Sequence, residues 1–299
     1  MSGAGMLDTP MPALGDIEGV ALPQSLPAVV DAHVHLFPDR IFEALWRWFD
    51  VHGWPIRYRL HAAEVIRFQL SRGVEHLIGL HYAHRPGVAR GLNDFMASLR
   101  SGRVHPVATV HPDDEDAEDI LRTAFTMGLR GVKLHCHVQA FSPDDPRLEP
   151  IYRVCQERDQ VLVMHAGREP KSPAYPVDPH LLCAVERIEA VLRSYPRLRV
   201  CVPHLGADEY RGYAALTERY DTLWLDTTMV AADYFPGPAL EDLLRVRRDR
   251  LLFGTDFPNL PYAWDRELKH LVAQRLPEAD LAALLGGNAR ALWALPTVH

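Results

Sequence analysis

The sequence predicts an α/β fold of the TIM-barrel type, a (β/α)₈ barrel built as a single domain. Eight short apolar runs alternate with segments of helical periodicity. The chain has 299 residues, and barrels of this type take roughly 250 residues. No GxGxxG motif follows the first run, which argues against the doubly wound open sheet of dinucleotide-binding proteins. We therefore expect a closed barrel.

The eight apolar runs are expected to form the parallel strands. Short, nearly continuous apolar runs that contain β-branched residues are typical of strands buried on both faces. The runs are Ala28–Val34, Val74–Leu80, Val104–Val110, Gly131–Leu134, Val161–Met164, Leu198–Val202, Thr222–Leu225 and Arg250–Phe253.

Helical segments with recognisable ends lie between these runs. Glycines, acidic residues near helix starts and an Asp178-Pro179 start signal mark their boundaries. The expected helices include His61–Arg72, Asp114–Met127, Asp178 to about Ser194, and Asp265–Arg275. Residues 1–27 are rich in Gly, Pro and Ala and predict a tail or surface arm, which leaves 28–299 as the barrel domain.

Composition narrows the choice of partners. The net charge is −7 and no basic stripe is present, which argues against nucleic acid as a partner. Four scattered cysteines, the lack of a secretory signal pattern and the lack of a long apolar run predict a soluble cytoplasmic protein that does not enter membranes. The expected partner is a small molecule, and a homo-oligomer stays open.

Polar residues follow every one of the eight runs. In a barrel all of these positions fall on the carboxyl rim of the strands, where active sites are built. The residues are His33, His35, His81, His111, Lys133, His135, His137, His165, His204, Asp226 and Asp256. This coincidence predicts a catalytic site at that rim.

A metal site is the chemistry that this set favours. Strand alternation sends His33 and His35 to one face, which is the barrel lumen. His165 and Asp256 would complete a shell of three histidines and one carboxylate, with an open position for catalysis. Zinc is the first expectation for this single divalent ion, and Mn²⁺, Fe²⁺ and Co²⁺ are alternatives.

Several motifs together resemble the amidohydrolase superfamily, in the branch of aminocarboxymuconate-semialdehyde decarboxylases, resorcylate-type decarboxylases and carboxylate lactonases. They are Asp31-Ala32-His33-Val34-His35, Gly131-Val132-Lys133-Leu134-His135, His165-Ala166-Gly167, His204-Leu205-Gly206, Gly254-Thr255-Asp256-Phe257-Pro258 and Gly287-Asn288-Ala289. The resemblance implies that His33, His35, His165 and Asp256 bind the metal and that His204 is catalytic. In binuclear members of the superfamily a carbamylated lysine bridges two metals, so Lys133 keeps a two-metal site open beside the favoured one-metal site.

The favoured function is hydrolysis of a small lactone, amide or ester by metal-activated water. A bound metal lowers the pKa of its water from about 15.7 toward 7. Asp256 is expected to accept a proton as well as bind the ion, and His204 to polarise the substrate or carry a proton. The alternative is a metal-dependent decarboxylase, and a non-catalytic metal-binding scaffold is a third hypothesis.

The substrate is expected to carry a carboxylate or another anionic group. Arg40, Arg85 and Arg168 lie in the predicted rim loops, and a guanidinium can hold a carboxylate through two hydrogen bonds. The alternative is that these arginines pair with nearby acids or with solvent. His135 is a further candidate for substrate contact. The tryptophans at positions 46, 48 and 54 are expected to form either packing or a substrate wall.

Overall fold

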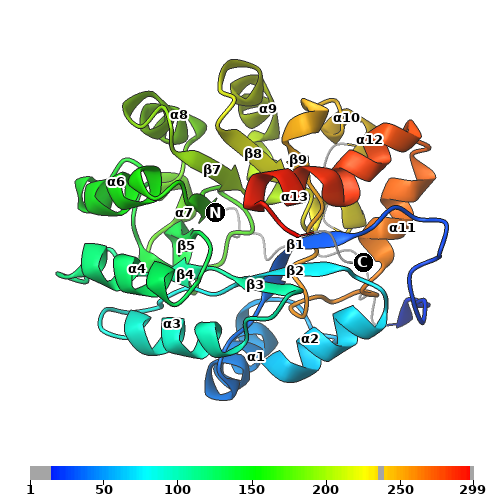
Figure 1. The fold of residues 1–299 in the computed structure, drawn as a ribbon, viewed down its shortest axis with the longest axis horizontal. Helices are drawn as coiled ribbons and strands as arrows, with labels where there is room; N and C mark the ends of the chain where they lie inside the picture. Colours follow the sequence, from blue (N-terminus) through cyan, green and yellow to red (C-terminus); the bar gives the residue numbers. More distant parts are fainter. Residues whose placement is uncertain (1–14, 235–238, 297–299) are drawn as a thin grey trace, which may run out of the picture.

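A computed structural model of the protein describes residues 15–234 and 239–296. A ring of parallel strands lies at its centre and helices surround it (Figure 1). The strands are β1 Val30–His35, β2 His76–Leu80, β3 Val104–Pro106, β4 Ala108–Thr109, β5 Val132–His135, β6 Val161–His165, β7 Arg199–Val202, β8 Leu223–Asp226 and β9 Leu251–Leu252. Each predicted run overlaps a strand, and the third run is divided into β3 and β4.

Two ladders of parallel strands make up the ring, β1 to β3 and β4 to β9. The interruption between β3 and β4 is one residue long, and there the Val107 N–H donates to the Gly79 carbonyl of β2 at 2.9 Å. On the opposite side the ladders meet where the Ala32 N–H of β1 donates to the Phe253 carbonyl just after β9 at 2.9 Å. The chain is therefore a TIM barrel, as its sequence predicts.

The helices lie mostly around the outside of the ring (Figure 1). They are α1 Asp39–His52, α2 Ala62–Ser71, α3 Ala89–Ser98, α4 Ala117–Thr126, α5 Cys136–Gln139, α6 Glu149–Glu157, α7 Pro179–Leu182, α8 Val185–Ser194, α9 Tyr210–Arg219, α10 Leu240–Leu243, α11 Arg266–Ala273, α12 Glu278–Ala282 and α13 Asn288–Trp293. The helix expected from Asp178 to Ser194 is two helices, because Cys183 and Ala184 have extended backbone angles between α7 and α8.

The lumen of the barrel has an apolar floor. Alternate residues of the strands, such as Val161 and Val163 of β6, pack there against Trp293 of α13. The register of β1 shifts between Asp31 and Val34, which is the mark of a bulge. This shift lets β1 contribute apolar side chains to the floor and histidines to the layer above it, so the polar groups gather at the carboxyl end of the strands.

The described part of the predicted arm lies against the barrel. The Gly19 N–H donates to Asp265 at 2.8 Å, and the Trp264 indole donates to the Gly19 carbonyl at 2.9 Å. The Leu22 N–H donates to the Arg72 carbonyl at 2.7 Å. The rest of the expected tail, residues 1–14, lies outside the described residues. Among the helices of the described part of the chain, none has the length and apolar character to cross a membrane.

Candidate active site

Three side chains from opposite ends of the sequence converge at the rim. The Nε2 atoms of His33 and His35 lie 3.3 Å and 3.0 Å from Oδ1 of Asp256. Ligand atoms that are each about 2.0–2.2 Å from a tetrahedral zinc ion are about 3.3–3.6 Å apart, close to these separations. The three residues are buried and offer two imidazole nitrogens and one carboxylate oxygen, a donor set suited to a divalent transition metal.

Asp226, at the end of β8, orients His33. Its Oδ2 lies 2.9 Å from Nδ1 of His33, and both side chains are almost wholly buried. Its Oδ1 accepts the backbone N–H groups of His204 at 3.0 Å and Thr228 at 3.2 Å. A carboxylate at Nδ1 stabilises the tautomer in which Nδ1 carries the proton, which leaves the Nε2 lone pair facing Asp256.

The electrostatics favour a neutral His33 beside ionised carboxylates. Burial and then the charge of Lys133 lower the pKa of His33 to about 4. Burial opposes ionisation of Asp256 and Asp226, but their contacts with His35 and His33 respectively outweigh it and hold both pKa values below the ordinary range. At neutral pH the cluster therefore presents free lone pairs and negative charge, which are the properties that a cation requires.

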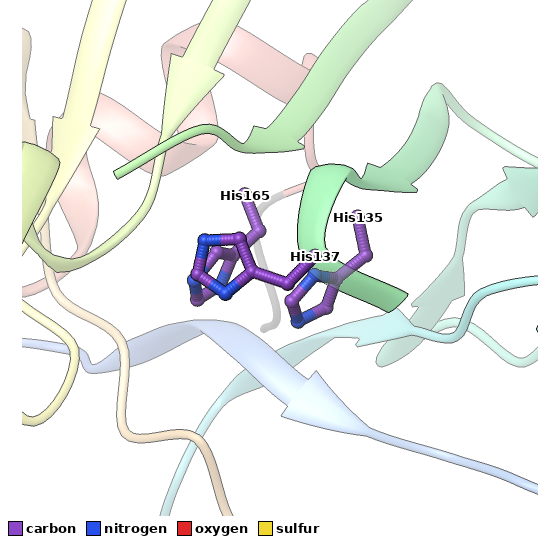
Figure 2. Close-up of side chains that lie close together, drawn as sticks. All are labelled: His135, His137 and His165. Carbon is purple, nitrogen blue, oxygen red and sulfur yellow. The ribbon is translucent and has the colours of Figure 1, made fainter. Parts of the chain in front are cut away.

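A second group of histidines adjoins the first. His135, His137 and His165 come from β5, α5 and β6, and one ring nitrogen of each lies within 4.8 Å of the others (Figure 2). Nε2 of His137 bonds to the Gly167 carbonyl at 2.7 Å. Nδ1 of His135, Nδ1 of His137 and Nε2 of His165 are buried without a hydrogen-bond partner. A buried nitrogen left without a partner is unfavourable, so a ligand or water is expected there.

His165 belongs to this second group rather than to the first. Its ring stacks on that of His135, with centroids 4.1 Å apart and planes 9° apart. No ring nitrogen of His165 joins the set of ligand atoms that His33, His35 and Asp256 form, whose members lie within 4.8 Å of one another. Of the four ligands expected from the sequence, the structure thus brings His33, His35 and Asp256 together and places His165 beside them.

His204 lies between the two groups. Its ring centroid is 5.7 Å from that of His33 and 4.7 Å from that of His165. Its Nδ1 is 3.0 Å from the Thr228 carbonyl, which only accepts, so Nδ1 carries the proton and Nε2 keeps a lone pair. Its backbone is in the left-handed region, with φ of 56°, which the hydrogen bond from its N–H to Asp226 helps to hold.

Lys133 projects from β5 into the same cavity and is wholly buried. Burial lowers its pKa to about 8, against the opposing charges of Asp226 and Asp256. Its Nζ has no hydrogen-bond partner. A buried amine without a partner is expected to engage a bound molecule, which is either a substrate or the CO₂ of a carbamate.

The polar groups open into a cavity of about 490 Å³. Of the three arginines expected to hold an anion, only Arg40 lines it. Arg168 instead pairs with Asp208 at 2.8 Å and with Glu209 at 3.3 Å, and Arg85 is exposed and outside the lining. His135, the tentative substrate contact, lines the cavity.

Several lining residues have no counterpart among the motifs. Tyr82 and Tyr175 face the cavity, and so does one side of α1, which includes Trp48. The residues of α1 have one signal in the sequence, the helical spacing of apolar residues after the first strand, whereas Tyr82 and Tyr175 have none. Trp54 also lines the cavity, whereas Trp46 packs on Phe42.

Asp31 has a structural position. It accepts the Thr255 hydroxyl at 2.6 Å and the Thr255 N–H at 3.1 Å, which ties β1 to the segment that carries Asp256. Burial raises its pKa to about 7. Asp31 is absent from the cavity lining, so its contacts indicate a structural role rather than contact with a substrate.

The chain belongs to the amidohydrolase family, whose sequence pattern it matches over residues 30–295. No curated protein matches the sequence. Among solved structures it resembles a TIM-barrel protein from Bordetella bronchiseptica, with 20% identity and a TM-score of 0.68 over 89% of this chain and 99% of that one.

Two further similar structures carry names that describe reactions. One is described as a 2-pyrone-4,6-dicarboxylic acid hydrolase from Pseudomonas putida, with 18% identity and a TM-score of 0.62 over 91% of this chain and 99% of that one. The other is a 5-carboxyvanillate decarboxylase from Novosphingobium aromaticivorans complexed with manganese, with 18% identity and a TM-score of 0.65 over 94% and 99%. At these identities the likeness is one of fold.

Proposed function

We propose that the protein is a metal-dependent hydrolase that attacks a small, carboxylated lactone, amide or ester with water. The observation that supports this most directly is the convergence of His33, His35 and Asp256, with His204 and Lys133 facing the same cavity. A divalent ion held there would supply Lewis acidity and lower the pKa of a bound water toward about 7. Zinc is our first proposal, and manganese is the ion in one similar structure.

The protein residues have distinct roles in this proposal. His33 and His35 offer Nε2 lone pairs to the ion, and His165, whose buried Nε2 has no hydrogen-bond partner, is the fourth proposed ligand. Asp256 is both a ligand and an acceptor for a proton of the attacking water. His204 keeps its Nε2 lone pair toward the cavity and moves a proton at the leaving group.

A decarboxylase is the second candidate. The same residues would hold a carboxylated substrate, and a proton would replace CO₂. The similar structures include one named as a hydrolase and one named as a decarboxylase, so both reactions are proposals for this fold.

Metal content and product analysis together test the proposal. Protein purified without chelator is expected to hold about one equivalent of divalent metal, and His33→Gln to lose it. Two equivalents with a CO₂ adduct on Lys133 would instead support the binuclear site. Solvent ¹⁸O in the product identifies the hydrolase, while release of CO₂ without ¹⁸O identifies the decarboxylase. Protein that neither holds nor takes up metal would support the non-catalytic scaffold.

An anionic substrate, a cytoplasmic location and a homo-oligomer are predictions from the sequence that stay open. Arg40 supports the first of these, because it lines the cavity.

A further inference from the structure

We propose that Glu267 is a positioning residue for His204, and that it acts through the peptide group that joins Thr228 to Met229. This inference rests on the role that the proposed function gives to His204. It concerns which ring nitrogen of His204 carries the proton, and therefore whether Nε2 keeps its lone pair.

One peptide group connects the two side chains. Its oxygen, which belongs to Thr228, lies 3.0 Å from Nδ1 of His204. Its N–H, which belongs to Met229, donates to Oε1 of Glu267 at 2.9 Å. The C=O and N–H of a trans peptide point in opposite directions, so His204 and Glu267 hold the same group from its two sides. Both contacts are lost if the peptide turns over.

Glu267 is held firmly behind this peptide. It belongs to α11, and only 1% of it is exposed. The Tyr262 hydroxyl donates to the same Oε1 at 3.0 Å. Burial raises the pKa of Glu267 well above its ordinary range, against its two hydrogen bonds, so the side chain is a neutral acid at neutral pH. Because Oε1 accepts both bonds, the proton belongs on Oε2, which has no hydrogen-bond partner among the described residues.

The peptide needs this contact because the backbone of Met229 is strained. Its φ is 60°, in the left-handed region that is unfavourable for a residue with a side chain. Rotation of the peptide would take this φ out of the left-handed region. It would also turn the Met229 N–H toward Nδ1 of His204, which would then accept a hydrogen bond and leave the ring proton on Nε2. The hydrogen bond to Glu267 opposes this rotation and so protects the Nε2 lone pair.

NMR of the histidine ring nitrogens tests the inference without a substrate. Spectra of full-length protein labelled with ¹⁵N-histidine are recorded as purified and after chelator treatment, and His204→Gln identifies the signals of His204. The parent is expected to carry this proton on Nδ1. Glu267→Met leaves the Met229 N–H without its acceptor. It is expected to shift the ratio of the two tautomers toward Nε2–H by roughly tenfold to a hundredfold, the range for a buried N–H left unpaired.

Three further variants make the test specific. Glu267→Gln keeps a neutral side chain with an oxygen acceptor and is expected to keep the parent tautomer. His270→Met changes the same face of α11, where Nδ1 lies 3.1 Å from the Ala231 carbonyl of the same loop, and it is expected to leave His204 unchanged. If Glu267→Met does not fold, Glu267→Asp replaces it. This variant withdraws the acid by one methylene and is expected to shift the tautomer in the same direction by a smaller factor.

The inference is overturned if His204 keeps its tautomer in folded Glu267→Met, or in Glu267→Asp where the former does not fold. It is also overturned if Glu267→Gln or His270→Met shifts the tautomer as far, because Glu267 would then serve only to anchor the loop.

Metal analysis of the same samples separates this inference from the proposed function. If Glu267→Met leaves the His204 tautomer unchanged while His33→Gln loses metal and turnover, the inference fails and the proposed function stands. If Glu267→Met shifts the tautomer but the parent neither holds nor takes up metal, the proposed function fails and the inference stands.

Discussion

Asp226→Asn is the substitution that tests most sharply how the metal cluster is organised. One oxygen of Asp226 faces Nδ1 of His33, and the other accepts two backbone N–H groups. An asparagine must turn its NH₂ group toward one side or the other. An NH₂ group that faced the backbone would meet two N–H donors, so we expect it to face Nδ1 of His33 instead. His33 would then carry its proton on Nε2, and that nitrogen would have no lone pair for a metal.

The expected loss of metal affinity follows from the contact between Asp226 and His33, which is a proposed metal ligand. Loss of an outer carboxylate that orients a metal-binding histidine commonly weakens the metal by about 10–100-fold, which is about 1.4–2.8 kcal/mol. Competition with a chelating dye measures this directly on the full-length protein. Asp208→Asn makes the same chemical change at a carboxylate that pairs with Arg168 on the rim, and it is expected to leave metal affinity unchanged.

A double-mutant cycle decides whether Asp226 acts through His33. If it does, Asp226→Asn adds little to the loss already caused by His33→Gln. Full additivity of the two losses, or an Asp226→Asn protein that binds metal as tightly as the parent, would refute the reasoning.

Two further predictions concern histidines. His204→Ala is expected to lower turnover by about 10²–10⁴-fold while the metal is retained, since His204 is surplus to the first cluster; elemental analysis showing lost metal would make it a ligand instead. His81 is buried, bonds to the Val107 carbonyl at 3.0 Å and has a pKa that burial lowers to about 3. As the pH falls, His81 therefore takes up a proton in the unfolded chain before it does so in the folded protein. The contribution of His81 to the free energy of unfolding is fully present above pH 6.5 and is lost as the pH falls toward 3. His81→Gln is expected to reduce this slope by up to about 1.4 kcal/mol per pH unit, measured by denaturant unfolding between pH 6 and 4, and an unchanged slope would count against it.

The sequence predicts the barrel well because the relevant patterns are local. Each apolar run overlaps a strand, and alternation along β1 brings His33 and His35 to Asp256 as expected. The bulge between Asp31 and Val34 has no clear signal in the sequence, yet it decides that the histidines share the lumen with the apolar floor. Such a shift is fixed by hydrogen bonds to neighbouring strands, which are distant in the sequence, so a local pattern does not predict it.

Side-chain partners were harder to predict than strand positions. Arg168 lies in a rim loop as expected, but Asp208 and Glu209, forty residues along the chain, occupy it. The sequence places Asp226 at the rim but gives no sign that its carboxylate faces Nδ1 of His33, which is 193 residues away along the chain. His165 ends its strand at the rim, but the angle of its ring depends on His135 of the adjacent strand.

The charges around the cluster explain how a protein with a net charge of −7 can attract an anionic substrate. Asp226 and Asp256 have lowered pKa values and are ionised, whereas the pKa of His33 is about 4 and that of Lys133 about 8. Two carboxylates and one ammonium leave one net negative charge, which draws a cation. A divalent cation reverses this to one net positive charge, which a single carboxylate of the substrate can neutralise. Metal binding is thus expected to precede anion binding, and removal of the metal should weaken the binding of a carboxylic acid more than the binding of its neutral amide.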